Sequence, residues 1–140
     1  MMLTRVDCFL DTNILIYAAL GRGQQERKRA TAADLMRKTR FGVSAQVLQE
    51  FYTVVIRKPD RPLAPAKAIE WIEAFEQQPC VSIDASLVKT AIEISQRFRI
   101  DYWDSAILAA AERLGAEIVY TEDLNHGQTY GLVRVINPFL

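Results

Sequence analysis

Histidine and cysteine are scarce in this chain of 140 residues, which contains one histidine and two cysteines. Structural zinc sites use cysteine and histidine at short, characteristic spacings, so the sequence excludes that class of site. Cys8 and Cys80 both lie in short apolar runs that are typical of buried strands. Buried free thiols fit a reducing compartment better than a disulfide framework does, and we therefore expect a cytoplasmic protein.

Long apolar runs are also missing, because no uninterrupted stretch approaches the roughly 18 residues that a transmembrane helix needs. The first residues, MMLTRVD, lack the apolar core of a signal peptide. We therefore expect neither secretion nor a membrane span.

Net charge is absent as well, since 17 basic residues balance 17 acidic ones. A protein that coats nucleic acid non-specifically relies on a basic field, so this balance argues against that mode of binding. A local basic patch is nevertheless present, interrupted only by Glu26 and Asp34. It fits two interpretations equally well, a surface for a polyanion and an ordinary solvated helix face. The patch consists of Arg22, Arg27, Lys28, Arg29, Arg37, Lys38 and Arg40.

What the chain does contain is a regular alternation of short apolar runs and longer amphipathic segments. Its length favours a single domain over residues 1–140. Uniformly apolar strands separated by helices predict an α/β fold with a central parallel sheet covered on both faces. Ser44 and Asp84 are placed to cap the helices that follow them. Strands are expected at 6–11, 41–44, 80–83, 117–121 and 133–137, and helices at 13–20, 24–39, 45–58, 64–78, 85–98 and 102–114.

Four acidic residues are expected along one edge of this sheet. Sites in open α/β sheets form beyond the carboxyl ends of the strands, where the following helices begin. Asp11 ends the first strand, and Asp123 follows the strand at 117–121. Glu50 and Asp104 lie near the starts of two helices, each at the border of an apolar helix face.

Each of these acids also has a purely structural interpretation. Asp11 could cap the next helix, and Asp104 could form a capping pair with Asp101. Asp123 could belong to an Asx-type turn, and Glu50 could form a salt bridge on a helix surface. Their shared position at one sheet edge is what favours a functional role for the set.

Convergence of the four carboxylates would be costly unless a cation neutralised their mutual repulsion. Hard oxygen donors without histidine or cysteine suit Mg²⁺ or Mn²⁺ rather than zinc. One such ion polarises a phosphoryl oxygen and lowers the pKa of bound water, and a second could stabilise the leaving oxygen. A converged quartet therefore predicts the hydrolysis of phosphodiester bonds.

The chain resembles the PIN-domain ribonucleases in four ordered segments, FLDTNILIYA, SAQVLQEFYTVV, YWDSAILAAA and YTEDLNHGQTYGLVRVINPF. The resemblance extends from about Val6 to Phe139 and is strongest to VapC-like toxins of bacterial type II toxin–antitoxin pairs. It implies a three-layer α/β/α fold and a Mg²⁺- or Mn²⁺-dependent endoribonuclease that leaves a 5′-phosphate and a 3′-hydroxyl. It further implies homodimers and inhibition by a cognate antitoxin, which inserts a C-terminal segment into the site.

The resemblance also assigns roles to individual residues. It makes Asp11, Asp104 and Asp123 the principal metal ligands, with Glu50 completing the catalytic set. Small polar residues that match positions beside this pocket are Thr12, Asn13 and Thr121. Within the basic patch, the residues expected to contact RNA are Arg22, Arg27, Lys28 and Arg29.

Several other residues are expected to have structural roles. Asp101 stands where such sequences often have serine, and it can cap the next helix equally well. Glu122 is expected to be a solvated neighbour of the site, because successive side chains of an extended chain point in opposite directions. His126 is expected to be structural or exposed. Trp71 and Trp103 are expected to pack in the core or an interface.

Two further functions remain open. A PIN-like module that binds RNA or protein without cutting would have the same fold, and absence of Mn²⁺ binding would favour it. A phospho-acceptor signalling domain also uses an acidic Mg²⁺ pocket, but it usually needs a lysine at a strand end, which is missing here. The segment RKPDRP (57–62) is expected to be a loop, with phosphate contact as a second interpretation.

Overall fold

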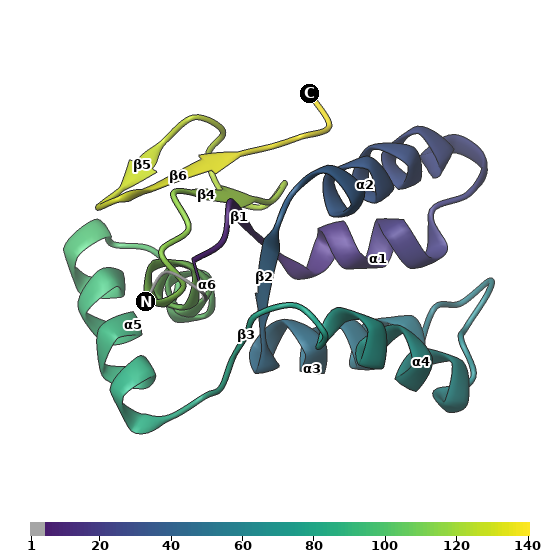
Figure 1. Cartoon of the computed structure of the whole chain (residues 1–140), viewed down its shortest axis with the longest axis horizontal. Coiled ribbons are helices and arrows are strands. Elements are labelled where there is room, and N and C mark those ends of the chain that lie inside the picture. Colours follow the sequence, from purple (N-terminus) through teal and green to yellow (C-terminus); the bar gives the residue numbers. More distant parts are fainter. Residues whose placement is uncertain (1–4) are drawn as a thin grey trace.

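The computed structural model describes residues 5–140, which alternate between short strands and helices (Figure 1). A short 3₁₀ turn, η1 (Gly23–Gln25), precedes the second helix. The strands are β1 (Cys8–Leu10), β2 (Phe41–Ser44), β3 (Cys80–Val81), β4 (Ile118–Tyr120), β5 (Thr129–Tyr130) and β6 (Val133–Ile136). The helices are α1 (Thr12–Leu20), α2 (Glu26–Lys38), α3 (Ala45–Val55), α4 (Pro65–Phe75), α5 (Ala85–Phe98) and α6 (Tyr102–Arg113).

The strands form one six-stranded sheet in the order β3-β2-β1-β4-β6-β5. Every neighbouring pair is parallel except β5 and β6, which form an antiparallel hairpin. Gly131 closes this hairpin with a φ of 63°, a backbone conformation that glycine adopts readily. The predicted α/β fold with a central parallel sheet is thus confirmed. The sequence does not predict β5, because Thr129 and Tyr130 lie in the polar stretch HGQTYG, which contains no apolar run.

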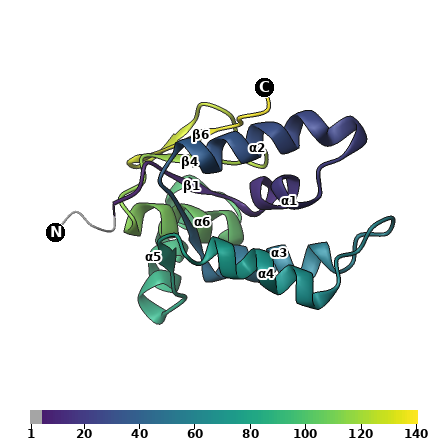
Figure 2. The ribbon, with the colours of Figure 1, turned by 45° about the vertical axis from the view of Figure 1, so that its right-hand side comes forward.

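Helices cover both faces of the sheet and make three layers. Helices α1 to α4 lie on one side, and α5 and α6 lie on the other (Figure 1). Within these layers α1 packs against α2 and α3, while α5 packs against α6. A second view shows the connection between α3 and α4 reaching out beyond the sheet (Figure 2). The expected α/β/α arrangement is therefore present.

The hydrophobic core is centred on β1, which lies between two parallel neighbours and is buried along its whole length. Helix α6 contributes an uninterrupted buried run from Ser105 to Ala111, rich in short alanine side chains that let the helix lie close to the sheet. Cys8 is buried as expected. Cys80 is exposed, so the expectation of two buried thiols is wrong there, because β3 is an edge strand.

Side-chain caps fix where several helices begin. Ser44 accepts a hydrogen bond from the backbone of Val47 at 3.3 Å, and Asp84 accepts one from Leu87 at 2.8 Å. Both predicted caps are therefore confirmed. Helix α3 ends at Val55, three residues earlier than expected, so the RKPDRP segment is a loop. Within residues 5–140, no helix combines the length and apolar character required to cross a bilayer.

Candidate active site

Four acidic side chains line one pocket at the carboxyl edge of the sheet. Asp11 directly follows β1, Asp123 lies beyond the end of β4, Glu50 belongs to α3, and Asp104 is in the first turn of α6. Together they border a cavity of about 310 Å³. The structure thus brings together all four acids that the sequence places at this edge.

Asp11 is buried, with only 5% of its surface exposed, and it combines two tasks. It is the N-cap of α1, because its Oδ1 accepts a hydrogen bond from the backbone of Thr12 at 2.7 Å. Its Oδ2 accepts a second bond from the hydroxyl of Thr121 at 2.8 Å. Burial raises the pKa of Asp11 to about 6 against the lowering effect of these bonds, and the nearby charges of Asp123 and Glu50 add to the rise.

Thr121 joins the two ends of the pocket through its hydroxyl oxygen. While it donates to Asp11, it accepts bonds from the backbone of Asp123 at 3.0 Å and from the Asn13 amide at 3.2 Å. The same amide nitrogen of Asn13 donates to the Asp123 carboxylate at 3.1 Å. Neutral donors therefore fix the position of both carboxylates without neutralising either charge.

Glu50 and Asp104 complete the pocket from the two flanking helices. The hydroxyl of Thr12 donates to Glu50 Oε1 at 2.7 Å, which orients that carboxylate. The Asp104 carboxylate accepts no hydrogen bond from any residue in the range 5–140. Partial burial and the charges of Asp101, Asp123 and Glu50 raise its pKa. Thr12, Asn13 and Thr121 thus all lie beside pocket carboxylates, as the sequence predicts.

The donor set suits a hard divalent cation held partly through water. Among the described residues, no three acidic, histidine or cysteine side chains are close enough to hold a metal ion by themselves. Mg²⁺ commonly keeps several waters and uses only one or two protein carboxylates together with substrate phosphates. Asn13 lines the same cavity, and its buried Oδ1 has no hydrogen-bond partner in the described chain. The pocket therefore fits a hydrated Mg²⁺ or Mn²⁺.

Two residues of the pocket wall differ from what the sequence suggests. Trp103 is 62% exposed beside Asp104, so it does not pack in the core. Gln46, which the sequence analysis does not select, is buried in the wall and donates to the backbone carbonyl of Trp103 at 3.2 Å. The only sequence signal for Gln46 is its place in the first turn of α3, four residues before Glu50.

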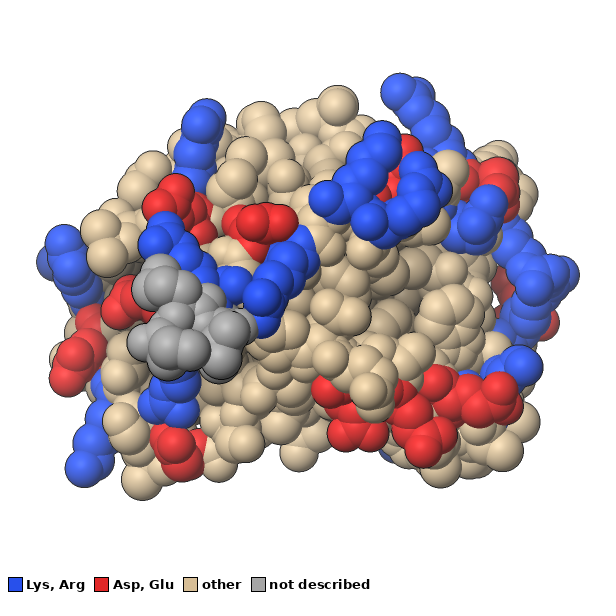
Figure 3. All heavy atoms as spheres, in the orientation of Figure 1, with Lys and Arg blue, Asp and Glu red and all other residues tan. Residues whose placement is uncertain are grey.

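The basic patch gathers over α2, whereas acidic side chains gather over α4 (Figure 3). Most of its cations are paired within the protein. Arg29 forms an ion pair with Glu26, and Arg37 pairs with Asp34 at 2.6 Å. Of the four predicted RNA contacts, Arg22 and Arg27 are exposed and have no ion pair with any residue in the range 5–140.

Lys28 is paired within the protein, although 36% of its side chain remains exposed. Its amine donates to Glu122 at 3.0 Å and to the hydroxyl of Tyr17 at 3.2 Å. The same Glu122 accepts a bond from the Tyr17 hydroxyl at 2.6 Å. Glu122 is therefore anchored to α1 and α2 rather than solvated, although it does lie outside the acidic pocket as expected. His126 has a structural role, because its Nδ1 accepts a bond from the backbone of Asn137 at 3.0 Å.

A parallel sheet with an acidic pocket at its carboxyl edge defines the general class, an α/β protein whose candidate site is a cluster of carboxylates. The family follows from the sequence itself, since residues 8–132 match the family model of the PIN domain. The chain belongs to the PIN-domain family. No curated protein matches the chain.

Several solved structures share this fold. A toxin–antitoxin complex from Klebsiella pneumoniae aligns with a TM-score of 0.69 and 17% identity, over 94% of this chain and 97% of the other. VapC20 of Mycobacterium tuberculosis, a toxin that cleaves the sarcin–ricin loop, aligns with a TM-score of 0.64 and 19% identity, over 83% and 89%. DNA-bound VapBC of Salmonella typhimurium aligns with a TM-score of 0.63 and 18% identity, over 93% of this chain and 96% of the other. The fold is therefore that of VapC-type PIN toxins.

Proposed function

We propose that this protein is a Mg²⁺- or Mn²⁺-dependent endoribonuclease and the toxin of a type II toxin–antitoxin pair. The observation that carries the proposal is the meeting of four carboxylates in one pocket at the carboxyl edge of the sheet, three of which, Asp11, Glu50 and Asp123, are held by uncharged donors. The raised pKa of Asp11 fits a pocket in which a bound cation would stabilise the ionised carboxylate. Membership of the PIN-domain family and the toxins among the structural relatives support the same assignment.

In this proposal Asp11, Asp104 and Asp123 would hold the ion. A bound divalent cation supplies charge stabilisation at a phosphoryl oxygen and lowers the pKa of a coordinated water. Thr121 and Asn13 hold two of the three ligands in place, which avoids the cost of ordering them during the reaction. The three acids thus provide a preorganised site for the phosphate that is cut.

Glu50 would act on the attacking water. Thr12 holds its Oε1, which leaves Oε2 free to accept a hydrogen bond from that water and then its proton. Attack by water breaks the bond between phosphorus and the 3′ oxygen, and the leaving oxygen takes a proton from solvent water, so the products carry a 5′-phosphate and a 3′-hydroxyl. This outcome differs from that of metal-independent ribonucleases, which use the ribose 2′-hydroxyl as the nucleophile.

A direct test is incubation of total RNA with the protein in Mn²⁺, followed by mapping of the product ends. We expect cuts that require the metal, disappear in EDTA, and are lost in Asp11→Asn. Cleavage that persists in EDTA, or in the variant, would show that the proposed mechanism is wrong. Products with cyclic phosphates would contradict the assignment of water as the nucleophile.

The partners of the protein form a further part of the proposal. The relatives from Klebsiella pneumoniae and Salmonella typhimurium are solved as toxin–antitoxin complexes, which supports a cognate antitoxin here. Homodimers and a cytoplasmic location are the arrangement we propose for the toxin. Exposed apolar side chains on α3 and α4, including Val54 and Ile69, offer a surface for such contacts. Light scattering of the purified chain, alone and with the product of the neighbouring gene, would test both partners.

A PIN-like module that binds RNA or protein without cutting is the second candidate. One observation favours it, namely that no three ligating side chains in residues 5–140 form a ready-made metal centre. Calorimetry with Mn²⁺ separates the two functions. Binding that is lost in Asp104→Asn supports the nuclease, whereas no binding by the wild-type protein supports the module.

A further inference from the structure

A second cavity adjoins the acidic pocket on the α1 side. It has a volume of about 420 Å³ and lies between α1 and the loop that follows α3. Asn13 and Ile16 line both cavities, so the two are neighbours along α1. We call this second cavity the α1 groove. Its size falls within the roughly 300–1,000 Å³ that is typical of ligand sites.

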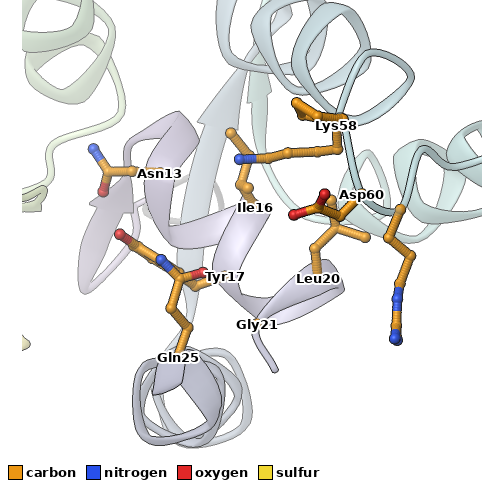
Figure 4. A pocket seen from close by; sticks show the side chains of 10 residues that line it. Asn13, Ile16, Tyr17, Leu20, Gly21, Gln25, Lys58 and Asp60 are labelled. Carbon is orange, nitrogen blue, oxygen red and sulfur yellow. The ribbon is translucent and has the colours of Figure 1, made fainter. Parts of the chain in front are cut away.

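The α1 groove combines an apolar floor with a cationic rim. Ile16 and Leu20 lie on α1, and Lys58 extends from the loop toward α1 (Figure 4), so that all three line the groove. Arg61 lies on the same loop and also lines the cavity. Asp60 is the one acid among the lining residues, so the rim carries an excess of positive charge.

The two rim cations are free of partners, unlike most cations of the basic patch. Neither Lys58 nor Arg61 forms an ion pair or a side-chain hydrogen bond with any residue in the described range. Lys28, by contrast, forms an ion pair with Glu122. A cation held near apolar groups without a counter-ion offers its charge to a ligand, because it does not first have to break an internal pair.

We propose that the α1 groove binds the single-stranded RNA segment adjacent to the phosphate that is cut. This inference rests on the proposed ribonuclease function and names the residues that guide its substrate. Lys58 and Arg61 would contact backbone phosphates, while Ile16 and Leu20 would pack against a base or ribose.

Charge and position favour RNA over a protein segment in this groove. A strand whose phosphate enters the acidic pocket must continue along a neighbouring surface, and the groove begins at Asn13, on the pocket's border. Rim cations beside an apolar floor offer the two kinds of contact that a single strand makes, to its phosphates and to its bases. The loop RKPDRP thereby gains a substrate-binding role that its composition alone leaves open.

The test measures RNA affinity without cleavage. A fluorescein-labelled single-stranded RNA of about 12 nucleotides is titrated with each protein in EDTA, and anisotropy is recorded over a series of salt concentrations. The groove variant is Lys58→Gln with Arg61→Gln. The matched control is Lys89→Gln with Arg134→Gln, which removes the same two charges from exposed positions on α5 and β6. Thermal melting confirms that both variants are folded.

We expect the groove variant to bind roughly 10- to 25-fold more weakly at about 0.1 M salt, with the salt slope reduced by about 1.4, since each contact to a single strand contributes about 0.7. The control variant should stay close to wild type. Equal affinities of the two variants, or no RNA binding by the wild type, would overturn the proposal and leave the groove to a protein segment. Wild-type binding without any cutting in Mn²⁺ would contradict the nuclease function while leaving the groove assignment intact.

Discussion

At the scale of single residues, Asp11 has the most constrained environment in the pocket. It caps α1 and accepts a bond from Thr121, yet burial still raises its pKa to about 6. In the metal-free protein the folded state therefore keeps this proton up to about pH 6, whereas the unfolded chain releases it near pH 4. The stability that Asp11 contributes is fully present below about pH 4 and is lost as the pH rises through 6.

Replacing Asp11 by asparagine should remove this pH dependence. The variant keeps an oxygen to cap α1 but carries no charge. In EDTA its free energy of unfolding relative to wild type should therefore increase by on the order of 2–3 kcal/mol from pH 4 to pH 7.5. Urea unfolding of both proteins at the two pH values measures the difference. If the free energies of unfolding of the two proteins depended on pH in the same way, the ionised Asp11 carboxylate would not destabilise the folded state.

Lys28 is a surface cation that forms an ion pair within the protein. Its bonds to Glu122 and Tyr17 join α1, α2 and the segment after β4. We predict that Lys28→Gln lowers the free energy of unfolding by about 1–2 kcal/mol, because the partly buried Glu122 loses a charged donor. The exposed Arg27→Gln is the matched control and should change stability by less than about 0.5 kcal/mol. Equal effects in urea unfolding would refute this role for Lys28.

The sequence predicts the four acids well and their neighbours less well. Asp11, Glu50 and Asp123 follow from one rule, that carboxyl ends of parallel strands meet at one edge. Asp104 does not, because α6 follows α5 rather than a strand, and it is indicated instead by its place at the start of an amphipathic helix. The pairing of Lys28 with Glu122 joins residues 94 positions apart, so it depends on tertiary packing that no local pattern encodes. The exposure of Trp103 escapes prediction for a similar reason, since helical periodicity does not show how far the core extends over a helix end.

At the scale of elements, the junction of α1 and η1 is the tightest point beside the α1 groove. A Cβ at Gly21 would lie 2.7 Å from the Tyr17 carbonyl oxygen, 2.8 Å from Arg29 Cβ and 2.9 Å from the Gln25 carbonyl oxygen. Its φ of −61° suits any residue, so the need for glycine is purely one of space. The close approach of α1 to α2 therefore depends on the missing side chain.

We predict that Gly21→Ala destabilises the protein by about 1–3 kcal/mol, because two of the three neighbours are backbone atoms that cannot move aside. Urea unfolding followed by circular dichroism measures the change. An unchanged midpoint would mean that the two helices separate at little cost, contrary to the packing described above.

Element prediction succeeds where a segment shows an apolar run or a helical period. The helices and every strand except β5 lie within about three residues of their predicted bounds. The edge strand β5 and the true end of α3 are the points of failure. A hairpin of two-residue strands is set by pairing with β6, and helix α3 ends where the chain turns to cover the α1 groove, so both depend on partners distant from the local sequence.

At the scale of the whole molecule, the balanced net charge hides a strong separation of charge. Basic side chains gather over α2 and acidic ones over α4, while the pocket carboxylates lie at the sheet edge (Figure 3). Partner-free cations border the α1 groove, which adjoins that pocket. This arrangement fits an enzyme that guides one strand to a metal, and it does not fit a protein that coats nucleic acid.

The most direct test of the central claim is RNA cleavage in Mn²⁺ by Asp104→Asn. This carboxylate accepts no hydrogen bond within residues 5–140, so asparagine should preserve the fold while removing a proposed metal ligand. We predict a loss of cleavage of at least roughly a hundredfold, with a melting temperature no lower than that of wild type, whereas the exposed Glu93→Gln keeps wild-type activity. Wild-type cleavage rates in Asp104→Asn would contradict the account.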